Sequence, residues 1–448
     1  MGLLALLAAC ARAPAGPASA PLPSAEPVPW RYEVAVHGPD LRIEARFAPG
    51  VAGIPRVDDD ATPFVRDVTE ATEGGWRVVR YRFALREAAE KRMDVDTAIA
   101  SGDVVVAPPS TWLLRPDAAT PGSFRYHVTT APPDRFVAAT HPSPDGAADT
   151  YEAPTDTLDG AGFAVFGPSH GGTVESGASR VVVSIAPHDL RLTDAEAMGW
   201  VKGAVDGIAA YLRHDFPAPR ALVVVQRGTP GNPTRGETLG DGGPAVLARA
   251  GDGVTAATVR DDWVMTHELL HVVLPSLSHD HVWLSEGLPS YVEPIVRVRA
   301  GTLSVEKLWR DLVEGLPQGL PEPGDEGLER THTWGRTYWG GSLYCLMVDV
   351  GIRDETRNAR SLDDVLRAIV ATGDDVEAHW DVTRLLDLGD AATGTHVLHD
   401  VFRELALAPG TIDLPALWRR LGVKVDGERV TFDDAAPLAP VRRGIGGR

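Results

Sequence analysis

The sequence predicts an α+β protein whose first part is rich in β-strands and whose last part is mainly helical. From Trp30 to Phe166, short segments alternate apolar and polar residues between clusters of Gly, Pro and Asp, which indicates strands. Residues 179–228 then follow a strand, helix, strand pattern. Beyond Ser285 the apolar residues recur mostly at helical spacing. Each pattern covers a different part of the chain, so together they define the fold class.

The elements follow in order from local signals. Thr193 precedes a long amphipathic stretch and is typical of a helix cap. The segment TLGDGGPAVLARAG reads as a strand interrupted by glycines, and the helix after it is expected to stop near Pro275. The segment VKVDGERVTFDD close to the end is expected to form a hairpin.

The chain is long enough for several domains. Its 448 residues exceed the usual domain length of about 100–200 residues. We expect a signal and Pro/Ala-rich tether over residues 1–29, a β-rich domain over 30–166, a central α+β domain over 167–300 and a mainly helical domain over 301–448.

The first ten residues, MGLLALLAAC, form a short apolar run that ends in Cys10. They resemble the lipobox of bacterial lipoproteins, in which the cysteine is acylated after cleavage. The resemblance implies attachment to the membrane through a lipid on Cys10 and a place in the bacterial cell envelope, on its periplasmic or extracellular face. The run is too short for a membrane span, which needs about 20 residues. The alternative is a start-site artefact or a frayed tail, because no basic residues precede the run.

Composition excludes two classes of protein. With 43 Lys and Arg against 62 Asp and Glu, the net charge is −19 and no basic run could follow a phosphate backbone, so a nucleic-acid partner is not expected. Cys10 and Cys345 are the only cysteines, which excludes a disulfide framework. Cys345 lies in an apolar helical run and is expected to be a core residue. Nothing in the sequence indicates the oligomeric state.

The segment VMTHELLHVV carries the pattern that points to chemistry. On a helix, His267 and His271 are four residues apart and project from one face, so both imidazoles can bind one metal ion. Glu268 is placed to reach a water molecule beside that ion. A catalytic zinc site also needs a third protein ligand and an open position for water. The alternative is a pair of solvent-facing histidines on a surface helix.

The downstream segment VWLSEGLPSYVEP offers the third ligand. Glu286 opens a second helix among aromatic and apolar residues, and Glu293 lies two helical turns further on the same face. Glu293 is therefore expected to accept the second ring N–H of a ligating histidine. His279 and His281 are alternative ligands, but a glutamate on a helix fixes the geometry better than residues in a loop.

HELLH followed by WLSEGLPSYVE resembles the gluzincin metallopeptidases, in the peptidase MA-like group with the aminopeptidase N and glycyl aminopeptidase families. The resemblance implies a thermolysin-like zinc catalytic domain over residues 167–300. It makes His267, His271 and Glu286 the Zn²⁺ ligands and Glu268 the general base. The 14 residues between His271 and Glu286 are fewer than is usual in the aminopeptidase N family, so the connecting loop is expected to be tighter.

A longer segment, TYWGGSLYCLMVDVGIRDETRNARSLDDVLRAI, resembles the glycyl aminopeptidases. The resemblance places on Tyr338 the tyrosine that donates a hydrogen bond to the oxyanion. The alternative for Tyr338 is a half-buried aromatic residue at a helix start. Asp349, Ile352 and Arg353 are expected to be structural and to fix their helix against the catalytic domain.

The segment GETLGDGGPAVLARAG lies where these families place the edge strand that binds the substrate. We expect Gly242 and Gly243 to let the backbone of a peptide approach closely. The family signatures whose glutamate binds a free amino terminus are absent, because Pro244 follows the two glycines. Exopeptidase specificity therefore does not carry over from the motif, and Glu237 is the remaining candidate for that role.

The sequence thus predicts a lipid-anchored, zinc-dependent peptidase that acts on peptide or protein substrates, aminopeptidase-like in its resemblance. Two other hypotheses remain. One is a non-catalytic envelope protein that keeps the metal site as a scaffold or binding module, because a fold alone does not prove a function. The other is a hydrolase of a non-peptide amide.

Overall fold

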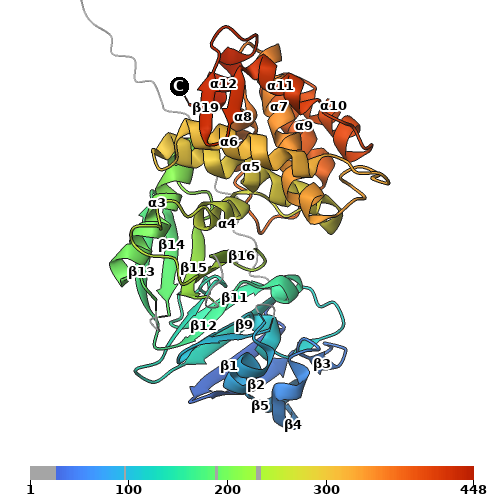
Figure 1. Ribbon diagram of the computed structural model, residues 1–448. Helices are drawn as coiled ribbons and strands as arrows, with labels where there is room; N and C mark the ends of the chain where they lie inside the picture. Colours follow the sequence, from blue (N-terminus) through green and yellow to red (C-terminus); the bar gives the residue numbers. More distant parts are fainter. Residues whose placement is uncertain (1–26, 95–96, 187–189, 229–233, 448) are drawn as a thin grey trace, which may run out of the picture.

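The computed structural model describes residues 27–94, 97–186, 190–228 and 234–447. Its strands gather in the amino-terminal half and its helices in the carboxy-terminal half (Figure 1). Cys10 and nearly all of the predicted tether lie outside the described residues. Within the described part of the chain, no helix is both long enough and apolar enough to cross a membrane.

The β-rich part consists of two sheets and a small strand pair. The first sheet has the order β11-β9-β1-β2-β5-β4 and the second the order β10-β12-β7-β6. The sheets and the short helices between their strands comprise β1 (Trp30–His37), β2 (Asp40–Phe47), β3 (Pro55–Arg56), η1 (Thr62–Phe64), β4 (Val65–Glu73), β5 (Trp76–Phe83), α1 (Leu85–Arg92), β6 (Ile99–Ser101), β7 (Val104–Ala107), α2 (Pro109–Trp112), β8 (Arg115–Pro116), β9 (Ser123–Thr129), β10 (Arg135–Ala138), β11 (Thr150–Pro154), η2 (Thr155–Gly160) and β12 (Ala164–Gly167).

Alternating side chains build the core of this part. Along β1, Trp30, Tyr32 and Val34 are buried and the residues between them are exposed, as the period-two pattern predicted. Trp112 is completely buried and packs edge-on against Tyr126. Trp112 therefore belongs to the core of the β-rich part.

The central part is built on a five-stranded sheet with the order β13-β14-β15-β17-β16. Its elements are β13 (His170–Ser176), β14 (Ser179–Ile185), α3 (Asp194–Leu212), β15 (Arg220–Arg227), β16 (Arg235–Leu239) and β17 (Ala245–Ala250). Strands β14, β15 and β17 are parallel, whereas β13 and β16 run antiparallel to their neighbours. Thr193 caps α3 through a capping box, as predicted.

One expectation for this sheet was wrong. The segment read as a single interrupted strand forms two strands, β16 and β17, joined by a turn. The turn reverses the chain at Gly242 and Gly243, whose φ angles of 64° and 138° favour glycine. Strand β16 therefore becomes an edge strand of the sheet, next to α4 (Figure 1).

The rest of the chain is mainly helical. It comprises α4 (Val264–Val273), η3 (His279–His281), α5 (Val282–Ala300), α6 (Val305–Gly315), η4 (Leu316–Gly319), η5 (Arg336–Gly340), α7 (Gly341–Glu355), α8 (Leu362–Val370), α9 (Val382–Thr393), α10 (Val397–Val401), η6 (Phe402–Ala406), α11 (Leu414–Leu421), β18 (Val423–Asp426), β19 (Arg429–Phe432) and α12 (Ala439–Ile445). Strands β18 and β19 form the expected hairpin. One hydrophobic cluster extends from Val174 to Ile445, so the central sheet and these helices share a core. The division at residue 300 stays a prediction.

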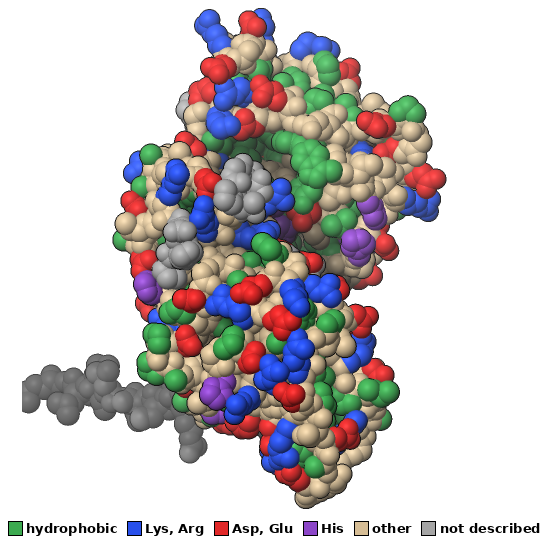
Figure 2. Space-filling view, turned by 60° about the horizontal axis from the view of Figure 1, so that its bottom comes forward, with side chains coloured by type: hydrophobic (Ala, Val, Ile, Leu, Met, Phe, Trp, Pro, Cys, Tyr) green, Lys and Arg blue, Asp and Glu red, His purple; other side chains and the backbone are tan. Residues whose placement is uncertain are grey.

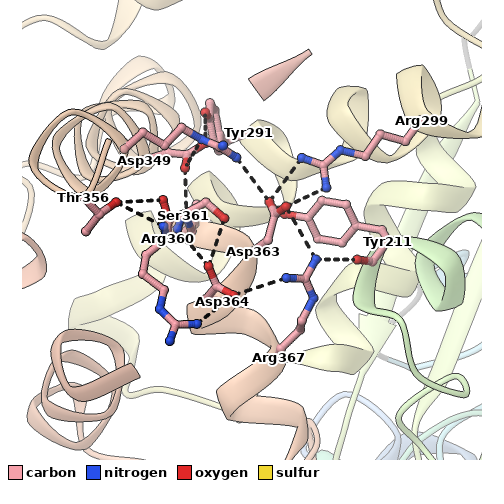
Figure 3. Close-up of polar contacts among 12 residues, drawn as sticks. Tyr211, Tyr291, Arg299, Asp349, Thr356, Arg360, Ser361, Asp363, Asp364 and Arg367 are labelled. Atoms are coloured by element: carbon pink, nitrogen blue, oxygen red, sulfur yellow. Dashed lines mark hydrogen bonds and ion pairs between the residues drawn. The ribbon is translucent and has the colours of Figure 1, made fainter. Parts of the chain in front are cut away.

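A buried polar network joins α5, α7 and α8 (Figure 3). The carboxylate of Asp349 accepts hydrogen bonds from Arg353 Nε at 2.9 Å and from the Tyr291 hydroxyl at 3.0 Å. Asp363 accepts from Arg299 Nη1 at 2.7 Å and pairs with Arg353 Nη2 at 3.8 Å. The structural role predicted for Asp349 and Arg353 is confirmed. The network holds α5 and α7 together. Helix α5 carries the predicted site residue Glu286, and α7 directly follows the segment that carries Tyr338.

We expect Asp363→Asn to lower the free energy of unfolding by about 3 kcal/mol, since removing one partner leaves a buried charge without compensation. The Asp363 side chain is 10% exposed, and Arg299 and Arg353 face it. Denaturant unfolding measures the change. The control is Asp354→Asn, whose pair with Arg420 is more than half exposed and should contribute at most about 1 kcal/mol. Equal effects of the two substitutions would contradict the prediction.

Candidate metal centre

Helix α4 brings two histidines together inside the protein. Nine of its ten residues are buried, so the alternative of a surface helix is wrong. The helix ends at Val273, two residues before Pro275, as predicted. His267 and His271 are one helical turn apart, and their Nε2 atoms are 3.3 Å from each other.

Helix α5 supplies a carboxylate to the same point. Glu286 Oε2 lies 3.4 Å from His267 Nε2 and 3.5 Å from His271 Nε2. Burial raises the pKa of Glu286, but hydrogen bonds and charges from the two histidines outweigh burial and hold that pKa below its ordinary value. The structure thus brings the predicted ligands together, and their ligand atoms all lie within 4.8 Å of one another.

The spacing of these atoms fits zinc. A tetrahedral Zn²⁺ with bonds of about 2.0–2.1 Å separates its ligand atoms by about 3.3–3.4 Å. The three separations among His267, His271 and Glu286 are 3.3, 3.4 and 3.5 Å. Two imidazoles and one carboxylate are also the donor set of many catalytic zinc sites. The residues present therefore suit a zinc ion.

The nearby histidines of the connecting segment do not join this group. His281 Nδ1 bonds to Glu329 Oε1 at 2.9 Å, and the His279 ring packs edge-on against His332. Among the described residues, the only cluster suited to a metal ion is His267, His271 and Glu286. The preference for Glu286 over the loop histidines agrees with this placement.

Glu268 lies beside the group and contacts β16. Its Oε2 accepts a hydrogen bond from the Thr238 hydroxyl at 2.7 Å. The backbone of Gly236 lies so close that a Cβ atom there would be 2.2 Å from Glu268 Cγ. Strand β16 therefore fixes the carboxylate of Glu268 through one hydroxyl and one glycine.

Tyr338 faces the same cavity from η5, a π-helical turn just before α7. Burial, followed by the charges of Glu286 and Glu268, raises the pKa of Tyr338 to about 12. Its hydroxyl therefore keeps its proton at neutral pH and can donate a hydrogen bond.

Glu293 does not make the contact predicted for it. Its Oε1 accepts a hydrogen bond from Arg297 Nη1 at 2.9 Å, four residues further along α5. Burial raises the pKa of Glu293 to about 7, although Arg297 acts in the opposite direction. His267 Nδ1 makes no hydrogen bond to any residue that the structure describes. His267 therefore does not make the expected bond to Glu293, whose carboxylate pairs with Arg297 instead.

The predicted substrate-binding glycines lie elsewhere. A Cβ on Gly243 would meet the carbonyl oxygen of Ala139 at 2.2 Å, and one on Gly242 would meet Thr157 Oγ1 at 3.0 Å. Both neighbours belong to the β-rich part, and neither glycine lines the cavity at the metal group. Gly242 and Gly243 thus serve the turn and the contact between the two parts. Of the predicted edge-strand segment, β16 lies at the sheet edge and lines the cavity.

A cavity of about 1180 Å³ contains the candidate site. The face shown in Figure 2 is hollowed in its upper half, and hydrophobic side chains gather beside the hollow. The cavity is bordered by β16, α4, α5, α6 and η5. Among the lining residues that sequence reasoning missed are Gly236, Thr238, Trp263 and Trp334. Two of them could have been found from their positions in the sequence. Trp263 directly precedes the histidine helix, and Trp334 lies shortly before Tyr338.

Comparisons with known proteins agree on the fold. No protein-family model matches the sequence, and no curated protein matches it. The structure is similar to an aminopeptidase N family protein from Idiomarina loihiensis, with a TM-score of 0.64 and 11% identity over 89% of this chain and 79% of that one. It is also similar to a mutant M1 zinc metallopeptidase from Deinococcus radiodurans bound to a Tyr-Ser-Ala substrate, with a TM-score of 0.50 and 14% identity over 86% of this chain and 94% of that one. The predicted α+β fold, with a β-rich amino-terminal part and a helical carboxy-terminal part, is confirmed.

Proposed function

We propose that this chain, which has a gluzincin aminopeptidase-like fold, is a zinc-dependent peptidase. The observation that carries the proposal is the geometry of His267, His271 and Glu286, whose ligand atoms are spaced as around a tetrahedral zinc ion. Such an ion, when bound, polarises a scissile carbonyl and lowers the pKa of water.

The residues around the three candidate ligands have separate roles in the proposed reaction. Glu268 accepts a proton from the attacking water and passes it to the leaving nitrogen. Tyr338 donates a hydrogen bond to the oxyanion that forms on the carbonyl oxygen when water attacks the carbonyl carbon. Strand β16 is an edge strand beside the cavity, and an edge strand suits backbone pairing with an extended peptide.

The competing hypothesis is a zinc-binding scaffold without activity. Such a protein needs neither a base nor an oxyanion donor. Here Glu268 is held by Thr238 at 2.7 Å and Tyr338 lines the same cavity as the candidate ligands. The presence of both groups supports an enzyme. We further propose that the enzyme removes amino-terminal residues, because its fold is similar to that of an aminopeptidase N family protein.

The test is cleavage of a diverse peptide library by the full-length chain, read by mass spectrometry. We expect cleavage to stop when a chelator removes the metal and to return when Zn²⁺ is added, because two imidazoles and one carboxylate at this spacing suit Zn²⁺. Loss of single amino-terminal residues would identify an aminopeptidase, and internal cuts an endopeptidase. Zinc bound in equal proportion to protein without any cleavage would overturn the peptidase and favour the scaffold.

A further inference from the structure

Two exposed tryptophans border the candidate site. The described residues include six exposed large hydrophobic side chains: Ile54, Val68, Met93, Trp263, Trp334 and Leu407. Only Trp263, 51% exposed, and Trp334, 63% exposed, line the cavity at the metal group. Large apolar groups left in water beside a cavity are typical of a surface that binds a ligand.

The structure holds both indoles next to the reacting groups. Trp263 precedes α4, and its ring meets the ring of His267 edge-on with centroids 5.2 Å apart. The ring of Trp334 lies 5.7 Å from that of Tyr338. Each indole therefore contacts a residue assigned to the reaction, one a candidate ligand and the other the candidate oxyanion donor.

A buried ion pair anchors the segment that carries Trp334. Arg336 Nε lies 2.8 Å from Asp325 Oδ2, and both side chains are at most 5% exposed. Arg336 also donates to the carbonyl oxygen of Gly319. The backbone beside Trp334 is thus fixed, so the exposure of its indole does not result from a loose loop.

The other surfaces of the cavity favour an apolar occupant. Leu303, Leu308 and Leu312 also line it. Two of its charged pairs are internally compensated: Arg297 bonds to Glu293 at 2.9 Å, and Lys307 pairs with Asp311 at 2.6 Å. The partners in these two pairs already neutralise each other, whereas flat indole faces bind aromatic rings well.

We propose that Trp263 and Trp334 form a subsite that selects substrates with an aromatic side chain next to the scissile bond. The proposal rests on the proposed peptidase function and names its substrate class. The indoles cover the substrate ring from the rim of the cavity and remove it from water. The two indoles determine which substrates bind, and they take no part in proton transfer or bond cleavage.

Binding to the Glu268→Gln variant tests the subsite without turnover. The probes are penta-alanine, the five pentapeptides in which one alanine is replaced by phenylalanine, and the five in which it is replaced by arginine. Calorimetric titration of the zinc-loaded, full-length protein should show at least one phenylalanine peptide binding about tenfold more tightly than penta-alanine, a difference of about 1.4 kcal/mol. Trp263→Ala and Trp334→Ala should each remove most of this gain.

The control is Met93→Ala, which removes a side chain 76% exposed in the β-rich part and should keep the gain. The subsite is overturned if no peptide binds, if phenylalanine gives no gain, if both tryptophan variants keep the gain, or if arginine binds more tightly, as it would through cation–π contacts. Cleavage by the wild type without aromatic preference rejects the subsite alone. Tryptophan-dependent binding without any cleavage by the wild type rejects the peptidase alone.

Discussion

Replacing Glu268 by glutamine is expected to lower kcat for peptide hydrolysis by about 10²- to 10⁴-fold, the range that general acid–base catalysis contributes. A glutamine has the shape of the glutamate but accepts no proton at neutral pH. It can still accept the hydrogen bond that Thr238 donates to Glu268 Oε2 at 2.7 Å. Glu268 is outside the candidate ligand group, so the zinc content should stay the same. Steady-state kinetics and metal analysis measure the two quantities.

The matched control is Glu306→Gln, an identical exchange at an exposed position in the first turn of α6. It should leave kcat within about twofold of the wild type, since a surface substitution away from the cavity changes little. Activity of Glu268→Gln equal to that of the control would refute the role of Glu268. A loss of zinc together with the loss of activity would show that Glu268 supports the metal group instead of accepting the proton.

The candidate ligands could be predicted from the sequence because helix geometry is strict. Residues four apart on a helix share a face, so His267 and His271 had to meet once α4 formed. Glu286 followed from a motif that opens the next helix. The same periodicity failed for Glu293, because it also places Arg297 on that face, one turn further. A buried carboxylate pairs with the nearest cation, and periodicity does not rank its neighbours.

The contacts made by the edge strand could not be predicted. The segment from Gly236 to Gly243 contains several glycines, and the sequence does not show which one faces a helix and which ones form a turn. In the structure, Gly242 and Gly243 form the turn that packs against the β-rich part, and Gly236 allows β16 to approach Glu268 closely. That distinction depends on the chain reversal between β16 and β17, which is a tertiary feature.

The tryptophans at the cavity were missed for a related reason. An isolated tryptophan in a sequence is expected to belong to a core, as Trp112 does. Trp263 and Trp334 are exposed because they line a cavity that lies between β16, α4, α6 and η5. The cavity is made by elements far apart in the chain, so local patterns do not reveal it.

Tyr338→Phe is expected to lower kcat about 10²- to 10³-fold, the usual effect of removing one oxyanion donor. The phenol has a pKa raised to about 12, so it carries its proton through the neutral range and donates it in a hydrogen bond. The oxyanion exists only in the transition state and the intermediate, so the change should appear in kcat and leave KM nearly unchanged. Zinc content should stay constant, because Tyr338 is not in the ligand group.

The split between kcat and KM separates this role from the alternative of a half-buried helix-start aromatic. An aromatic residue that only packs against Trp334 keeps that contact as phenylalanine, and kcat would then change by less than about tenfold. Tyr151→Phe removes a hydroxyl from β11, outside the cavity, and controls for the loss of a phenol in general. A rise in KM with unchanged kcat would assign Tyr338 to substrate binding. A fall in kcat alone means that the Tyr338 hydroxyl stabilises charge that forms during the reaction.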